Sequence, residues 1–425
     1  MQSSRQLLSR RVFIVGGSIT KFVGKGSPDF IDKKHPDFGK KQNTTIEEYI
    51  TLATNEALKN TNVDPDLVDR IAIGNFAGEL FTNQGHMGAA VIGANKKLLN
   101  KPSMRVEGAC ASGALAVQVA YDAIRSGADV ALAVGAEVQT TVSPRIGGDY
   151  LARASHYARQ RSIDDFTFPC LFAKRMKGIL EREHFTMEDT ARVAVKAYAN
   201  GNLNPLAHMH NARVSLDHAS TVSDKNPNFL NNEIYKPFLR ITDCSQVTDG
   251  GAAMILVSED GLKKINASKD SIVEIKGLSC ATGNLYEDAE DPTQMTTSRV
   301  AAVRAQEAAG IKASEFQVAE VHDCFTIAEL LMYEALGIAP YGGAKDLIRA
   351  GATNLDGKIP VNTGGGLISF GHPVGATGIK QFLEVYRQMK GQCGGYQLKN
   401  IPTFGATLNM GGDDKTAVSA VLQNL

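Results

Sequence analysis

Residues 104–138 read MRVEGACASGALAVQVAYDAIRSGADVALAVGAEV, and this stretch decides the fold. It begins as the end of a strand, makes a tight turn at GACASG, continues as a helix and closes with a short buried strand at 128–138. The alternation continues outward: strands are expected at 12–17, 69–76 and 248–260, and a helix at 46–60, where apolar residues recur at helical spacing. Strands that alternate with helices predict an α/β fold with parallel strand pairing.

Residues 139–245 break this alternation. They hold a basic stretch and then a segment rich in His, Asn and Asp, and the buried-strand pattern is absent from them. Connections inside a compact domain are usually about 4–6 residues long, so this segment is predicted to be an inserted domain. The predicted parts are residues 1–138 together with 246–268, the insertion 139–245, and residues 269–425.

The chain also resembles itself. CASGALAVQVAY, which starts at Cys110, matches GATGIKQFLEVY, which starts at Gly375. A turn followed by a strand precedes each block, and the pairs Gly250–Gly251 and Gly411–Gly412 accompany an apolar strand downstream. The spacings differ by about the length of the insertion. Chance similarity between two Gly- and Ala-rich helix starts is the alternative, but three blocks in matched order favour a duplicated α/β protein.

The composition of the chain argues against several classes of function. The 425 residues include 45 basic and 45 acidic side chains, so the formal net charge is zero, which argues against a general nucleic-acid or membrane-surface binder. No apolar run approaches the ~20 residues of a membrane-spanning helix. The six cysteines form no CxxC pair, which disfavours a zinc ribbon and indicates a reducing compartment. The start, MQSSRQLLSRR, fits either a short mitochondrial presequence or a frayed basic terminus.

Three segments could carry chemistry. Cys110 lies between glycines at a predicted helix N-terminus, where the helix dipole lowers a thiol pKa and prepares a nucleophile; the alternative is a small buried cysteine. His322, Asp323 and Cys324 follow a predicted strand, where open α/β sheets bind ligands, although such a motif is often structural. His372 lies in a glycine-dense turn whose sequence, GHPVGATG, matches neither phosphate-binding glycine motif.

Together, GACASGA, HDCF, NTGGGLISFGHPVGATG and the terminal NMGG resemble the thiolases, specifically the sterol carrier protein branch, over residues 10–424. HDCF is the discriminating block. Most thiolases have Asn-Glu-Ala-Phe there and take a second catalytic cysteine from a late Cys-x-Gly motif. That late position reads Asn409-Met410-Gly411 here, so Cys324 is the expected replacement.

The resemblance implies a duplicated thiolase fold: two βαβαβαββ halves in five αβαβα layers, with an inserted loop domain. It implies that Cys110 is acylated, that Cys324 is the acid/base at the α-carbon, and that His372 activates Cys110. His322 would serve an oxyanion hole, and the backbone N–H groups of Cys110 and Gly411 a second one. Ser245 aligns, less securely, with a serine near the pantetheine arm.

The reaction implied is a reversible exchange of acyl-CoA and acetyl-CoA with 3-ketoacyl-CoA and CoA. CoA thioesters are then substrates, and no cofactor or metal is expected. The basic stretch of the insertion could meet the nucleotide phosphates. A homodimer is expected, in the mitochondrion or a peroxisome-like organelle.

Two other functions stay open. A decarboxylating ketosynthase of the same superfamily would use Cys110, His322 and His372 with a malonyl thioester, but it needs no second cysteine such as Cys324. A non-catalytic CoA-thioester or lipid-binding protein could also use this fold, because fold alone does not give function.

Overall fold

The computed structural model describes residues 10–425, and the basic terminus up to residue 9 lies outside the described residues. Its strands are β1 Phe13–Ile19, β2 Arg70–Gly74, β3 Ser103–Val106, β4 Val130–Glu137, β5 Gly250–Val257, β6 Val273–Thr282, β7 Val318–Val321, β8 Phe404–Gly411 and β9 Thr416–Asn424. Its α-helices are α2 Ile46–Thr61, α3 Gly78–Phe81, α4 Met87–Ile92, α5 Ser112–Arg125, α6 Pro144–Leu151, α7 Tyr157–Gln160, α8 Thr167–Glu181, α9 Met187–Gly201, α10 Leu216–Ser220, α11 Glu259–Lys264, α12 Thr296–Ala309, α13 Thr326–Leu336, α14 Ala344–Arg349 and α15 Val374–Met389. In the part of the chain that the structure describes, no helix is long and apolar enough to cross a bilayer.

The strand order confirms the duplication. The first half of the sheet runs β3-β2-β4-β5-β1, and the second half, read inward from its own edge, runs β7-β8-β9-β6. A parallel bridge from Ala319 to Val361 supplies the counterpart of β3. In each half the outer pairs are parallel and the inner pairs antiparallel. The first strand of each half has a pairing irregularity at the matching place, between Ile14 and Gly16 and between Ile275 and Gly277.

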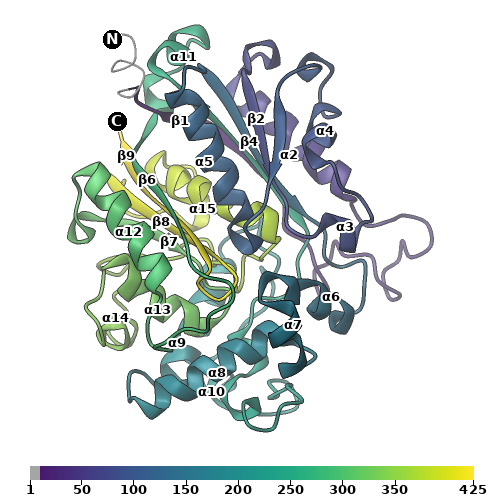
Figure 1. The fold of residues 1–425 in the computed structure, drawn as a ribbon, viewed down its shortest axis with the longest axis vertical. Coiled ribbons are helices and arrows are strands. Elements are labelled where there is room, and N and C mark those ends of the chain that lie inside the picture. Colours follow the sequence, from purple (N-terminus) through teal and green to yellow (C-terminus); the bar gives the residue numbers. More distant parts are fainter. Residues whose placement is uncertain (1–9) are drawn as a thin grey trace.

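Three apolar clusters separate the sheet and helices into layers. In one cluster α2 covers the outer face of the first half. In the second, α5 and α15 lie between the two halves, and in the third α12 and α13 cover the outer face of the second half (Figure 1). This is the expected five-layer order. The halves are nevertheless hydrogen-bonded into one sheet of nine strands, because Phe13 and Ile14 of β1 pair with Glu274 and Val273 of β6.

The repeated glycines explain how the two central helices approach. A Cβ on Gly113 of α5 would lie 2.6 Å from the carbonyl of Gly375, and a Cβ on Gly378 of α15 would collide with the backbone of Ala114. The small residues that the two blocks share therefore form the contact between α5 and α15. Because both helices begin at this contact, the segments before them, which carry Cys110 and His372, are brought together.

Gly378→Ala is expected to destabilise the fold by about 1–3 kcal/mol, because the added methyl group meets backbone that cannot move aside. Urea unfolding measures the change. The matched control is Gly93→Ala, an exposed residue at the end of α4 whose added methyl would meet only one backbone oxygen, at 3.2 Å. Equal stability changes for the two variants would contradict the packing argument.

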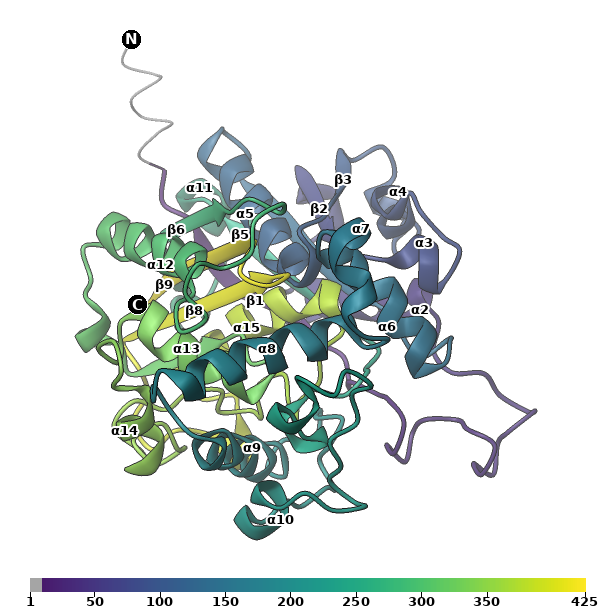
Figure 2. The ribbon, with the colours of Figure 1, turned by 60° about the horizontal axis from the view of Figure 1, so that its bottom comes forward.

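The predicted insertion lies between β4 and β5, which are antiparallel neighbours in the sheet. Between these two strands the described chain forms α6 to α10 and no strand. The helices gather at one end of the molecule, where α8 runs beside the ends of the sheet (Figures 1 and 2). The precise boundaries of the three predicted parts stay predictions.

Candidate active site

A cavity of about 460 Å³ opens where the two halves and the segment between β4 and β5 meet. Cys110, Cys324 and His372 line it, together with Ser245 and Gly412. The rest of the wall is largely apolar; its aromatic and aliphatic members include Phe81, Leu151, Phe166, Phe168, Phe229 and Phe325. The cavity therefore joins two thiols and an imidazole to a space suited to an apolar chain.

Cys110 is presented by a tight turn between β3 and α5. Its neighbour Ala109 has a φ of +52°, an unusual backbone for a residue with a side chain. Two hydrogen bonds hold that residue: its N–H donates to the Glu107 carboxylate at 2.6 Å, and its carbonyl accepts from the Ser112 hydroxyl at 2.6 Å. Gly411 packs against the same turn, since a Cβ there would collide with the carbonyl of Gly108.

The pKa of the Cys110 thiol is raised, whereas the sequence predicted a lowered one. Burial raises the pKa of its thiol to about 12, although the N–H of Gly412 donates to the sulfur and acts in the opposite direction. The cost of removing the thiolate from water is thus larger than its stabilisation by the helix N-terminus. The prediction of a lowered Cys110 pKa was therefore wrong. Cys110 is a neutral thiol in the free protein and needs a base to activate it.

His372 can be that base. Its Nδ1 lies 2.7 Å from the Thr377 hydroxyl, which donates its own hydrogen to the carbonyl of Pro373 at 3.0 Å. Nδ1 must therefore carry the ring proton, and Nε2 keeps a free lone pair. Burial and the nearby Lys380 ammonium lower the His372 pKa to about 3, so the ring is neutral. Nε2 is buried and has no hydrogen-bond partner among residues 10–425.

His322 has the opposite tautomer. Its Nδ1 lies 3.0 Å from the side-chain nitrogen of Asn409, which can only donate, so Nε2 carries the proton. Burial, followed by the neighbouring His372, lowers the His322 pKa well below its usual value. The two rings lie 5.2 Å apart, edge to face. One ring nitrogen of each histidine and the Cys110 sulfur all lie within 4.8 Å of one another. One imidazole thus accepts a proton beside the thiol, while the other offers a hydrogen-bond donor.

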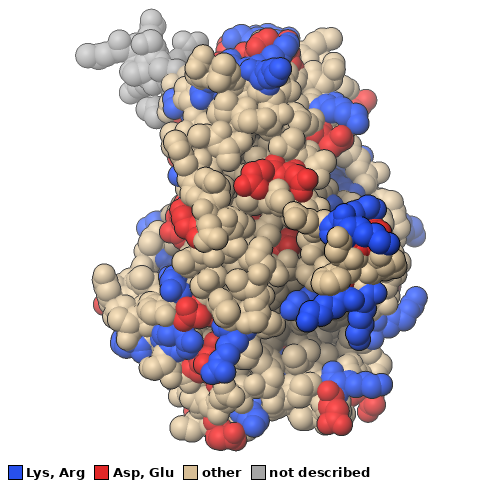
Figure 3. Space-filling view, turned by 90° about the vertical axis from the view of Figure 1, so that its right-hand side faces the viewer, with Lys and Arg blue, Asp and Glu red and all other residues tan. Residues whose placement is uncertain are grey.

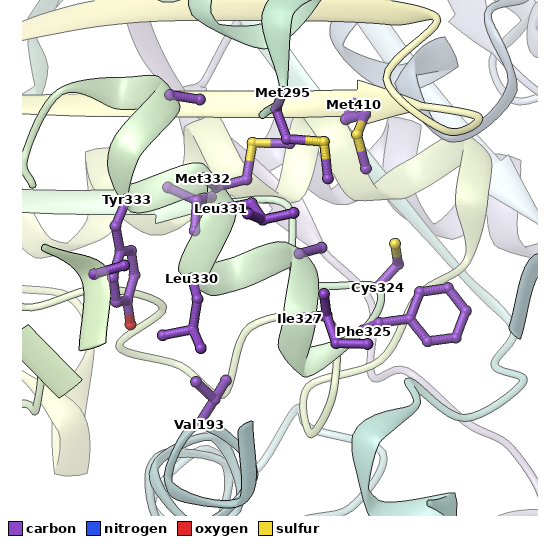
Figure 4. Close-up of a cluster of buried hydrophobic side chains, with 14 of the residues drawn as sticks. Val193, Met295, Cys324, Phe325, Ile327, Leu330, Leu331, Met332, Tyr333 and Met410 are labelled. Carbon is purple, nitrogen blue, oxygen red and sulfur yellow. The ribbon is translucent and has the colours of Figure 1, made fainter. Parts of the chain in front are cut away.

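Cys324 lies between β7 and α13, at the edge of a large apolar cluster (Figure 4). Its carbonyl accepts a hydrogen bond from the N–H of Ser245 at 3.0 Å, which ties the two cavity-lining segments together. Burial, and then the proximity of Cys110 and Asp323, raise the Cys324 pKa well above that of a free thiol. Cys324 is therefore protonated at rest. The side chain of the neighbouring Asp323 accepts a hydrogen bond from the backbone N–H of Leu367 at 2.7 Å. The role of this side chain is therefore structural.

The structure changes one expectation about this site. Gly411 is the last residue of β8, and Gly412 rather than Gly411 lines the cavity and donates to the Cys110 sulfur. Each of the seven cations in the basic stretch pairs with an acid, and five acids serve all seven, so a contact of this stretch with the nucleotide phosphates stays a prediction. These pairs are Arg153–Asp149, Arg159–Asp288, Arg161–Asp149, Lys174–Asp288, Arg175–Asp413, Lys177–Glu181 and Arg182–Asp291. Figure 3 shows Lys and Arg side chains beside Asp and Glu on one face of the molecule.

Sequence reasoning missed the two residues that set the histidine tautomers. Thr377 belongs to GATG and Asn409 to NMGG, so both lie inside motifs that the sequence singled out. Glu137 was missed as well: it ends β4 and accepts from the backbone N–H groups of Phe76, Ala77 and Gly375. The only available signal was a polar residue at the end of a buried segment.

Thr377→Val is expected to lower kcat/KM by about 10²-fold, because the His372 ring loses the acceptor that fixes its tautomer. Thr377→Ser keeps the hydroxyl and is the matched control, with activity near that of the unmodified protein. Steady-state kinetics and a thermal melt of each variant give the comparison. An active valine variant would show that the hydroxyl does not orient the base.

The Cys110 pKa of about 12 predicts the pH dependence of its alkylation. Only thiolate reacts with iodoacetamide, and below the pKa its fraction rises ~10-fold per pH unit. Peptide mass spectrometry is expected to show the modification rate of Cys110 still rising between pH 7 and pH 10. A plateau near neutral pH would instead reveal a resting thiolate–imidazolium pair.

Nearly the whole chain is similar to known protein families and proteins. The thiolase N-terminal domain family matches residues 31–260, and the thiolase C-terminal domain-like family matches residues 279–424. An acetyl-CoA acetyltransferase of Methanothermobacter thermautotrophicus is 32% identical over 89% of this chain and 95% of its own length. Sterol carrier protein 2 of Bos taurus is 29% identical over 93% of this chain and 69% of its own length. The human mitochondrial 3-ketoacyl-CoA thiolase structure in complex with CoA has a TM-score of 0.71 at 16% identity and covers 98% of this chain and 99% of its own.

Proposed function

Because the chain belongs to the thiolase family, we propose that it is an acyltransferase that interconverts acyl-CoA plus acetyl-CoA with 3-ketoacyl-CoA plus CoA. The observation that carries the proposal is the pairing of Cys110 with an imidazole whose lone pair is free, in a cavity that holds a second thiol, Cys324. Acetyl-CoA acetyltransferases among the relatives support the acyltransferase class.

In the first half-reaction His372 Nε2 takes the proton of Cys110, and the thiolate attacks a substrate carbonyl. The resulting oxyanion would accept hydrogen bonds from the backbone N–H groups at Cys110 and Gly412. In the thiolysis direction the bond between the α- and β-carbons of 3-ketoacyl-CoA then breaks. Its electrons form the enolate of acetyl-CoA, and the remaining acyl group stays on Cys110.

The second thiol completes the exchange. The enolate oxygen accepts from His322 Nε2–H, and Cys324 gives its proton to the α-carbon, which releases acetyl-CoA. The raised pKa of Cys324 agrees with this role, because the thiol keeps its proton until a strong carbon base appears. The proton that His372 took from Cys110 then returns to the Cys324 thiolate. CoA enters as a thiol, gives its proton to His372 Nε2 and attacks the acyl-Cys110 thioester. Acyl-CoA leaves, and the released Cys110 thiolate takes that proton back from His372. Condensation is the same sequence reversed.

The test is thiolysis of acetoacetyl-CoA and of a longer 3-ketoacyl-CoA with free CoA, followed by separation of the acyl-CoA products. We expect two acyl-CoA products per turnover. The apolar wall of the cavity favours activity on the longer substrate as well. Consumption of malonyl-CoA with release of CO₂ would support the ketosynthase alternative. Tight CoA-thioester binding without any turnover would support the non-catalytic one.

We further propose that the protein is a homodimer. Among the described strands, β3 forms one edge of the sheet and pairs with β2 alone. Met104 on this strand and Leu99 just before it are exposed large apolar residues. A second copy paired along this edge would cover both. Analytical ultracentrifugation measures the assembly, and a monomer at micromolar concentration would contradict it.

A further inference from the structure

The site that would bind the acyl group also has the donor set of a metal site. We propose that Cys110, His322 and His372 together bind one soft or borderline divalent cation, such as Zn²⁺ or Cd²⁺, and that this blocks Cys110. The proposal depends on the geometry of the three side chains and not on the reaction proposed above.

The three donor atoms already face one another. The sulfur and one nitrogen from each ring lie within 4.8 Å of one another, so small side-chain rotations bring them to metal–ligand distances of about 2.0–2.3 Å. The Nε2 atoms of both histidines are buried and have no hydrogen-bond partner in the part of the chain that the structure describes, and His322 and His372 are 1% and 8% exposed. Two unpartnered buried nitrogens beside a thiol are unusual where nothing binds.

The surroundings of the two rings also resemble those of metal-binding histidines. Such a histidine usually has its other ring nitrogen held by a neighbouring polar group. Thr377 holds Nδ1 of His372 at 2.7 Å, and Asn409 holds Nδ1 of His322 at 3.0 Å. The cavity of about 460 Å³ reaches Cys110 and gives an ion a path of entry.

Binding requires two proton movements. The Cys110 S–H bond breaks, a sulfur–metal bond forms, and the proton leaves to solvent. The ring proton of His322 moves from Nε2 to Nδ1, so Nε2 can donate its lone pair to the metal. The Asn409 amide then turns, and its Oδ1, which is buried and unpartnered, accepts the new Nδ1–H. Three protein ligands leave a fourth position open for water or a substrate thiol.

The same geometry makes metal and acyl group mutually exclusive. An acylated Cys110 is a thioester and has no thiolate to give. The metal should therefore protect Cys110 from acylation and from alkylation, and a chelator should restore both. The site would act as a reversible block that a free soft cation imposes.

The experiment is a Cd²⁺ titration of the full-length protein, monitored by the ultraviolet sulfur-to-cadmium charge-transfer absorbance. We expect one Cd²⁺ per chain and loss of the band in Cys110→Ser. The matched control is Cys280→Ser, which removes the other partly exposed cysteine and should leave the band unchanged. The double variant His322→Ala/His372→Ala should bind at least ~100-fold more weakly, while its circular dichroism spectrum shows that it folds.

Two results would overturn the proposal. A band that persists in Cys110→Ser would place the cation on another thiol. Unchanged affinity in the histidine double variant would show that the thiol binds alone. Because these readouts need no turnover, they stay informative even if the thiolysis assay fails.

Discussion

Cys324→Ala is expected to abolish carbon–carbon bond cleavage while sparing acyl transfer to Cys110. Thiolysis should fall by about 10²–10⁴-fold, the usual contribution of a positioned acid/base. The exchange of radiolabelled CoA with acyl-CoA should persist, because that half-reaction needs only the Cys110–His372 pair. Cys324 is 8% exposed and borders the apolar cluster, so alanine removes the sulfur with little change to the wall.

The control for this variant is Cys393→Ala, a buried cysteine that does not line the cavity. It should retain both activities. Equal loss of thiolysis and exchange in Cys324→Ala, with a normal melting curve, would mean that Cys324 is not specific to the carbon–carbon step. Full thiolysis in that variant would remove it from the mechanism.

Cys110→Ala is expected to have the largest effect, a loss of about 10⁴–10⁶-fold in both thiolysis and CoA exchange, because no covalent intermediate can form. The variant should still fold and bind CoA thioesters, since alanine fits the turn that Ala109 and Ser112 hold. Initial rates of both reactions and the dissociation constant of acyl-CoA separate these effects. Exchange that survives in Cys110→Ala would identify a different nucleophile.

The duplication could be predicted from the sequence because it is marked by short stretches of neighbouring residues. The contact between α5 and α15 needs small residues at both helix starts, and these residues are the matching letters of CASGA and GATG. The strand pattern around them was equally local. The join of the two halves through β1 and β6 was not predicted, because pairing between distant strands leaves no mark on either strand alone.

The site was predicted less completely. The motifs identified the residues that the cavity brings together, but not their protonation. The high pKa of Cys110 comes from burial by segments far apart in the chain, which a helix-dipole argument omits. The acids that pair with the basic stretch were not predicted for the same reason, since Asp288 and Asp413 follow it by more than 100 residues.

The central claim is that Cys110 carries the acyl group, and intact-protein mass spectrometry tests it most directly. Incubation with acetyl-CoA, followed by acid quenching, should add the mass of one acetyl group to the unmodified protein and to Cys324→Ala. Cys110→Ala should show no added mass. Release of CoA by the unmodified protein without any adduct, or an adduct that persists in Cys110→Ala, would contradict the account.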